Sequence, residues 1–95
     1  MITLPRSDLK KQEYLQMVAE KFEKDKEYSE PEVNDMINSC DVDDHALFRR
    51  ELVNFNYLGK DTGKGIYWLK TKTLSKEELD KIASNEKNIR GFNED

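Results

Sequence analysis

Two adjacent arginines, Arg49 and Arg50, are the residues of this 95-residue chain whose chemistry points most directly to a ligand. A guanidinium presents a planar fork of N–H donors that fits a phosphate or the edge of a guanine in the major groove. Three of the lysines that follow are at positions 60, 64 and 70, and lysine is a common phosphate contact. The basic residues therefore predict a surface that binds double-stranded DNA, made of Arg49, Arg50, Lys60, Lys64 and Lys70.

The same residues also have a structural interpretation. In a small domain an arginine often bridges to a carboxylate on a neighbouring helix, and Glu32 and Asp35 are available for such a bridge. Lysines on a hairpin equally protect a strand edge against aggregation. Asp41, Asp43 and Asp44 precede the arginine pair, and carboxylates in that position repel phosphate. Both interpretations stay open on sequence alone.

Tyr67 and Trp68 add two aromatic rings within the run GIYWLK. Neighbouring side chains of a strand point to opposite faces, so one ring should face the core and the other the outside. An exposed ring can stack on a base or anchor a protein partner. The alternative is that both rings are packed, and the sequence does not say which of them is exposed.

Other chemistries lack the residues that they need. Cys40 and His45 are the single cysteine and the single histidine, which is too few ligands for a zinc or haem site. A Ser-His-Asp or Cys-His arrangement cannot be assembled, and no glycine-rich phosphate loop precedes a helix. We therefore expect no enzymatic activity, no cofactor and no metal.

Charge is distributed unevenly along the chain, whose formal net charge is -4. Residues 27–48 carry seven acidic and no basic side chains, whereas residues 49–72 carry six basic and two acidic ones. An anionic partner would meet the second segment. The first segment supports the alternative function, a protein-protein interaction module that does not touch DNA.

Length and composition favour one small folded domain over residues 1–95. The chain is 36% hydrophobic and 38% charged, which is polar but still supplies core-forming residues. We place the core of the domain at about residues 6–72 and a C-terminal helix at about 75–88. The N-terminal residues contain no apolar run long enough for a signal peptide or a membrane span, so we expect a cytoplasmic protein without membrane contact.

Apolar residues at helical spacing predict three amphipathic helices. Ser29 and Glu32 form a capping-box pattern at the start of the second, and Ser75 with Glu78 repeats it at the start of a fourth. Asp41 or Asp43 is placed to cap the third, in which both arginines fall opposite the apolar arc. The apolar residues are Leu15, Val18, Ala19 and Phe22 in residues 8–24, Val33, Met36 and Ile37 in residues 29–39 with Cys40 directly after them, and Leu47, Phe48, Leu52 and Phe55 in residues 43–56.

Two short β-prone runs, NYLGK and GIYWLK, flank the turn DTGKG and predict a hairpin. Helix, helix, turn, helix, hairpin, helix is the order of a winged helix-turn-helix domain of the α+β class. In that fold the third helix crosses the second, and the hairpin forms the wing. The prediction is a domain that contacts DNA through residues 43–56 and the wing, with homodimer formation through the C-terminal helix as an option.

Several runs resemble a bacterial family known as domain of unknown function 2087. They are YSEPEVN at residues 28–34, DDHALFRRELV at 43–53 and YWL at 67–69, with a leading LPR and AEKF in support. The similarity covers about residues 4–70 and leaves the last helix as an extension. Members occur alone or behind helix-turn-helix regulators of the arsenic-repressor type, so the resemblance implies a role linked to transcription and no enzymatic activity.

Overall fold

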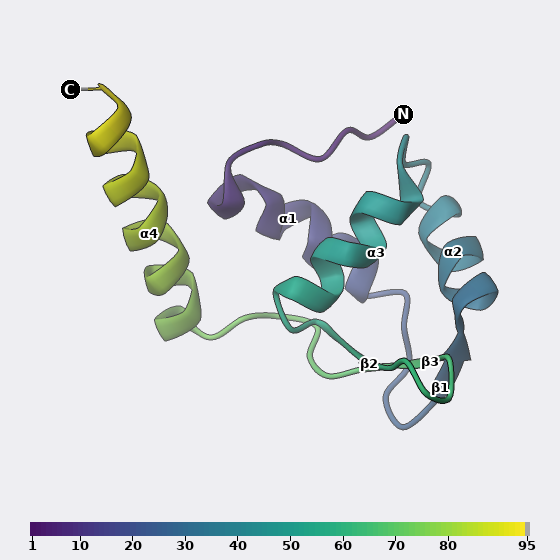
Figure 1. Ribbon diagram of the computed structural model, residues 1–95. Helices are drawn as coiled ribbons and strands as arrows, with labels where there is room; N and C mark the ends of the chain where they lie inside the picture. Colours follow the sequence, from purple (N-terminus) through teal and green to yellow (C-terminus); the bar gives the residue numbers. More distant parts are fainter. Residues whose placement is uncertain (95) are drawn as a thin grey trace.

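A computed structural model describes residues 1–94, with side chains described for residues 1–86 (Figure 1). The strands form one antiparallel sheet in the order β1-β3-β2. The described part of the chain is thus a small α+β fold, as predicted. The elements are α1 (Asp8–Ala19), β1 (Glu27–Ser29), α2 (Glu30–Asn38), α3 (His45–Asn54), β2 (Leu58–Asp61), β3 (Ile66–Leu69) and α4 (Lys76–Glu94).

Both predicted capping boxes are present. The Ser29 amide donates to Glu32 Oε1 at 2.9 Å, and the Glu32 amide donates to Ser29 Oγ at 3.3 Å. Ser75 and Glu78 exchange the same two bonds at 3.1 Å each. These bonds satisfy amides that have no partner within the helix, which fixes where α2 and α4 begin. The hydrogen bonds from Ser29 also lower the pKa of Glu32.

The start of α3 differs from the prediction. Neither Asp41 nor Asp43 caps it: Asp44 does, because its Oδ1 accepts from the Leu47 amide at 3.0 Å. Asp41 has a positive φ of 58°, and the chain from there to Asp43 is held by backbone bonds with Ile2. Because this short segment is extended, α3 begins at residue 45 and not at residue 43 as predicted.

Three further boundaries were not anticipated. α1 ends at Ala19 although the apolar stripe continues to Phe22, because the chain turns there through bonds between residues three apart. β1 is a three-residue strand in which Tyr28 pairs with Tyr67 of β3. It is too short to show an alternating pattern, so the sequence predicts only the hairpin. α4 continues to Glu94, six residues beyond the predicted end.

The core lies between the helices and one face of the sheet. All of the predicted stripe of α1 is buried, as are Val33 and Ile37 of α2 and Phe48 and Leu52 of α3. The remaining predicted stripe residues of α2 and α3 are half-buried against this core. α4 packs against α1, at the left of Figure 1. No helix within the described residues is both long and apolar enough to cross a membrane.

Tyr57 joins α1, α3 and the base of the hairpin. Its side chain is fully buried, and its hydroxyl donates to Gln12 Oε1 at 2.7 Å and accepts from Gln16 Nε2 at 3.2 Å. Its amide donates to the carbonyl of Leu52, and its carbonyl accepts from the amide of Lys70. Burial raises the pKa of Tyr57, because an apolar environment disfavours the phenolate.

Replacing Tyr57→Phe should lower the free energy of unfolding by about 1–3 kcal/mol, because the buried Gln12 loses its donor. Urea unfolding followed by circular dichroism measures the change. Tyr14→Phe on α1, where the ring is only partly buried, is the matched control and should change stability little. Equal losses in the two variants would contradict this role of the Tyr57 hydroxyl.

Stability should also fall at alkaline pH. The pKa of Tyr57 is raised by burial, and that of Lys11 is raised because hydrogen bonds with Asp8 and Glu51 outweigh its burial. Both groups hold their proton more tightly in the folded chain than in the unfolded chain. Their contribution to the free energy of unfolding is therefore complete below about pH 10 and is lost as the pH rises through their pKa values in the folded chain. Urea midpoints measured upward from about pH 9 should decline less steeply for Tyr57→Phe than for wild type.

Candidate nucleic-acid interface

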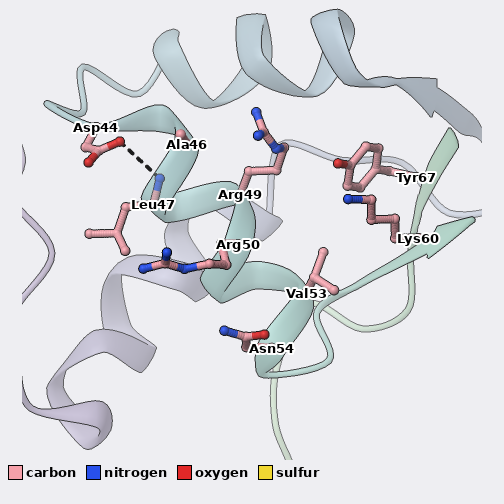
Figure 2. A pocket seen from close by; sticks show the side chains of 9 residues that line it. All are labelled: Asp44, Ala46, Leu47, Arg49, Arg50, Val53, Asn54, Lys60 and Tyr67. Carbon is pink, nitrogen blue, oxygen red and sulfur yellow. Dashed lines mark hydrogen bonds between the residues drawn. The ribbon is translucent and has the colours of Figure 1, made fainter. Parts of the chain in front are cut away.

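A hollow of about 560 Å³ lies between the outer face of α3 and the hairpin (Figure 2). The opposite face of α3 is buried through Phe48 and Leu52, so this face is the one that the core leaves accessible. Three of the five predicted DNA-binding residues meet here. The hollow is lined by Asp44, Ala46, Leu47, Arg49, Arg50, Val53, Asn54, Lys60 and Tyr67.

Arg49 is held against α2 and does not point freely outward as predicted. Its Nη1 donates to Asn34 Oδ1, and its Nε lies 3.7 Å from Glu30 Oε1. The side chain is 22% exposed. An arginine bridge to a carboxylate of α2, as the structural interpretation predicts, is therefore present. Its partner is Glu30, and neither Glu32 nor Asp35 takes part in it.

Arg50 extends into solvent. Its side chain is 69% exposed, and it leaves α3 in a different direction from Arg49 (Figure 2). The nearest carboxylate oxygen, Glu51 Oε1, is 3.8 Å from its Nε, so the contact is a loose one. Of the two arginines, Arg50 keeps more of its charge available to a ligand.

The hairpin positions its lysines differently. Lys60 on β2 is exposed, and its Nζ lies 5.5 Å from the centre of the Tyr67 ring, inside the hollow (Figure 2). Lys64 lies in the exposed turn between the strands, where its amide donates to Asp61 Oδ1. Lys70 follows the far end of β3 beside Tyr57, so the structure does not bring it to the hollow.

Tyr67 and Trp68 face opposite sides of the sheet, as the alternation predicts. Tyr67 is 1% exposed and donates its hydroxyl proton to Glu30 Oε1 at 3.1 Å, whereas Trp68 is half-buried. The indole of Trp68 lies directly on Gly59: a Cβ there would be 2.2 Å from Trp68 Cε2. Residue 59 must therefore be glycine for the ring to keep this position.

Sequence reasoning missed a buried ion pair beside the arginines. Glu51 is 8% exposed and accepts from Lys11 Nζ at 3.1 Å and from Asn54 Nδ2 at 3.0 Å. Its position could have been found, since residue 51 falls four after Leu47 on the apolar arc of α3. The partner could not, because Lys11 belongs to a helix 40 residues away.

The aspartates before α3 are engaged with nearby groups. Asp44 caps the helix, and Asp43 Oδ2 accepts from Thr3 Oγ1 at 2.7 Å. Among the described residues, no group of three or more His, Cys, Asp or Glu side chains is arranged to hold a metal ion. The chemistry that this surface offers is therefore cationic hydrogen bonding beside acidic residues that accept hydrogen bonds from neutral groups.

The family model of DUF2087, described as an uncharacterized protein conserved in bacteria, matches residues 1–69. The chain belongs to this family. The matched region runs from the N-terminus through α3 and the hairpin, and α4 lies outside it. No curated protein and no solved structure matches the chain.

Substituting Gly59→Ala should displace the Trp68 ring, shift the tryptophan emission to the red and lower stability by about 1–3 kcal/mol. Trp68 is the single tryptophan, so the emission reports this ring alone. Gly63→Ala is the control, because the nearest atom to its Cβ is a carboxylate oxygen of Asp61 at 3.3 Å. An unchanged spectrum in Gly59→Ala would contradict the packing described.

Proposed function

We propose that this chain is a winged-helix domain that binds double-stranded DNA through α3 and the β2–β3 hairpin. The order α1, β1, α2, α3, β2, β3 is that of winged helix-turn-helix domains, and α2 and α3 pack against each other after a short turn. In such domains α3 enters the major groove and the hairpin is the wing. α4 is an addition to this arrangement.

The observation that carries the proposal is the meeting of helix and hairpin cations at one hollow. Arg50 from α3 and Lys60 from β2 line it, and both are exposed. Lys64 at the tip of the hairpin adds a third exposed cation on the same element. A recognition helix flanked by a basic loop contacts the bases and the adjacent phosphates at once.

Acidic residues near the surface oppose this function. The hydrogen bonds that Asp44 and Asp43 accept come from neutral donors, the Leu47 amide and the Thr3 hydroxyl, and do not neutralise a carboxylate. Their repulsion therefore weakens binding by a single copy. We infer that two copies bind adjacent half-sites, with α4 as the contact between them, and that the domain serves transcriptional regulation in bacteria.

The competing function is a protein-protein interaction module. The observation that favours it is Trp68, which borders a second hollow of about 350 Å³ together with Asp25, Lys26, Glu27 and Leu69. A partly buried indole that borders a hollow can serve as an anchor at a protein interface. This hollow lies on the face of the sheet opposite Tyr67, so a protein partner there and DNA at α3 would use different surfaces.

Fluorescence anisotropy with a labelled duplex of random sequence tests the DNA proposal. Three phosphate contacts predict about 40-fold weaker binding between about 50 and about 200 mM salt, and each alanine at Arg50, Lys60 or Lys64 should reduce the logarithmic salt slope by about 1. Lys10→Ala on α1, which removes one exposed charge elsewhere, should leave the slope unchanged. Absence of binding at low salt would rule the proposal out.

A further inference from the structure

We propose that Glu30 and Asn34 of α2 are positioning residues that hold Arg49 as a base-reading side chain, while Arg50, Lys60 and Lys64 contact phosphates. This inference rests on the proposed DNA-binding function and deepens it. It divides the basic residues into one that discriminates sequence and three that supply affinity. The division follows from how differently the two arginines are held.

Arg49 is held against α2 by one hydrogen bond and one longer ion-pair contact. Asn34 Oδ1 accepts from Nη1, and Glu30 Oε1 lies beside Nε. Glu30 and Asn34 are one helical turn apart, so they form a continuous support on the face of α2 that meets α3. These contacts use Nε and one N–H of Nη1, so Nη2 and the second N–H of Nη1 are left to form a bidentate pair of donors. A fork oriented in this way loses little entropy when it binds a base edge.

Glu30 also compensates the charge of Arg49. A neighbouring carboxylate weakens the attraction of a cation for phosphate, which is the term that makes DNA binding independent of sequence. The ion-pair distances are similar, 3.7 Å from Arg49 to Glu30 and 3.8 Å from Arg50 to Glu51, but Glu51 is already paired with Lys11. The Arg50 side chain is also 69% exposed, compared with 22% for Arg49. Arg50 is therefore suited to phosphate contact, and Arg49 to directional hydrogen bonding.

The same carboxylate connects the helix to the wing. Glu30 Oε1 accepts from the Tyr67 hydroxyl at 3.1 Å, and Lys60 Nζ lies above the Tyr67 ring. Glu30 thus contacts both Arg49 and Tyr67, and Figure 2 shows Arg49, Lys60 and Tyr67 at the same hollow. Glu30, the first residue of α2, therefore contacts one residue of the helix that would read bases and one residue of the hairpin that would contact the backbone.

The experiment first selects a preferred duplex from a random-sequence pool with the wild-type chain. Dissociation constants are then measured for that duplex and for a scrambled one, and their ratio is the discrimination. Asn34→Ala and Glu30→Gln should reduce the ratio about 10-fold, a loss within the range that one bidentate base contact provides. Asp35→Asn, which removes an exposed charge from the same helix, should keep the ratio.

Arg49→Lys separates positioning from charge. It retains the cation but removes the fork, so the ratio should fall while the salt slope stays at its wild-type value. Arg50→Ala should do the opposite and lower the slope by about 1 at constant ratio. Thermal unfolding of each variant shows that the loss of discrimination is measured on a folded chain.

Two results would overturn the inference while leaving the proposed function intact. One is a wild-type chain that binds DNA with the expected salt dependence but selects no preferred duplex. The other is a wild-type ratio in the folded Arg49→Lys variant, which would make Arg49 a purely structural bridge. Absence of salt-dependent binding in the wild-type chain would overturn the proposed function, and this inference with it.

Discussion

The buried hydroxyl and backbone of Tyr57 form the junction on which the rest of the structure depends. Its side chain bonds to two glutamines of α1, while its backbone bonds to the end of α3 and to the residue that follows β3. A buried hydroxyl is costly unless both its donor and its acceptor capacity are used, and here both are. These bonds hold the base of the hairpin at the end of α3, beside the hollow between them.

Separation of charge lets an acidic chain present a basic surface. The net charge of -4 hides a surface on which Arg50, Lys60 and Lys64 are exposed. Several neighbouring carboxylates are occupied within the fold: Glu51 pairs with Lys11, and Glu30 lies beside Arg49. Pairing with a nearby cation removes much of the electrostatic field of these carboxylates at a distance. The field of the exposed cations is reduced mainly by dissolved salt. The positions of the charged side chains therefore matter more than the net charge of the chain for which partner this surface can bind.

Prediction from sequence succeeded where the signal is local. The capping boxes, the apolar stripes and the hairpin depend on residues three to eight positions apart, and each was found at about the right place. It failed at β1, whose three residues form a strand only because β3 lies beside them. It also named Glu32 and Asp35 as partners of the arginines, because spacing alone cannot show which side of α2 faces α3.

The sequence by itself determined the class of fold, the starts of α2 and α4 and the basic character of the segment from residue 49. Capping bonds and periodic apolar burial are encoded within a few neighbouring residues, which is why they could be read directly. Only the tertiary structure decided that Arg49 is held by Glu30 and Asn34 while Arg50 is exposed, and that Trp68 lies on Gly59. These outcomes depend on how α2, α3 and the sheet pack together, because adjacent side chains of one helix meet different neighbours across the interface.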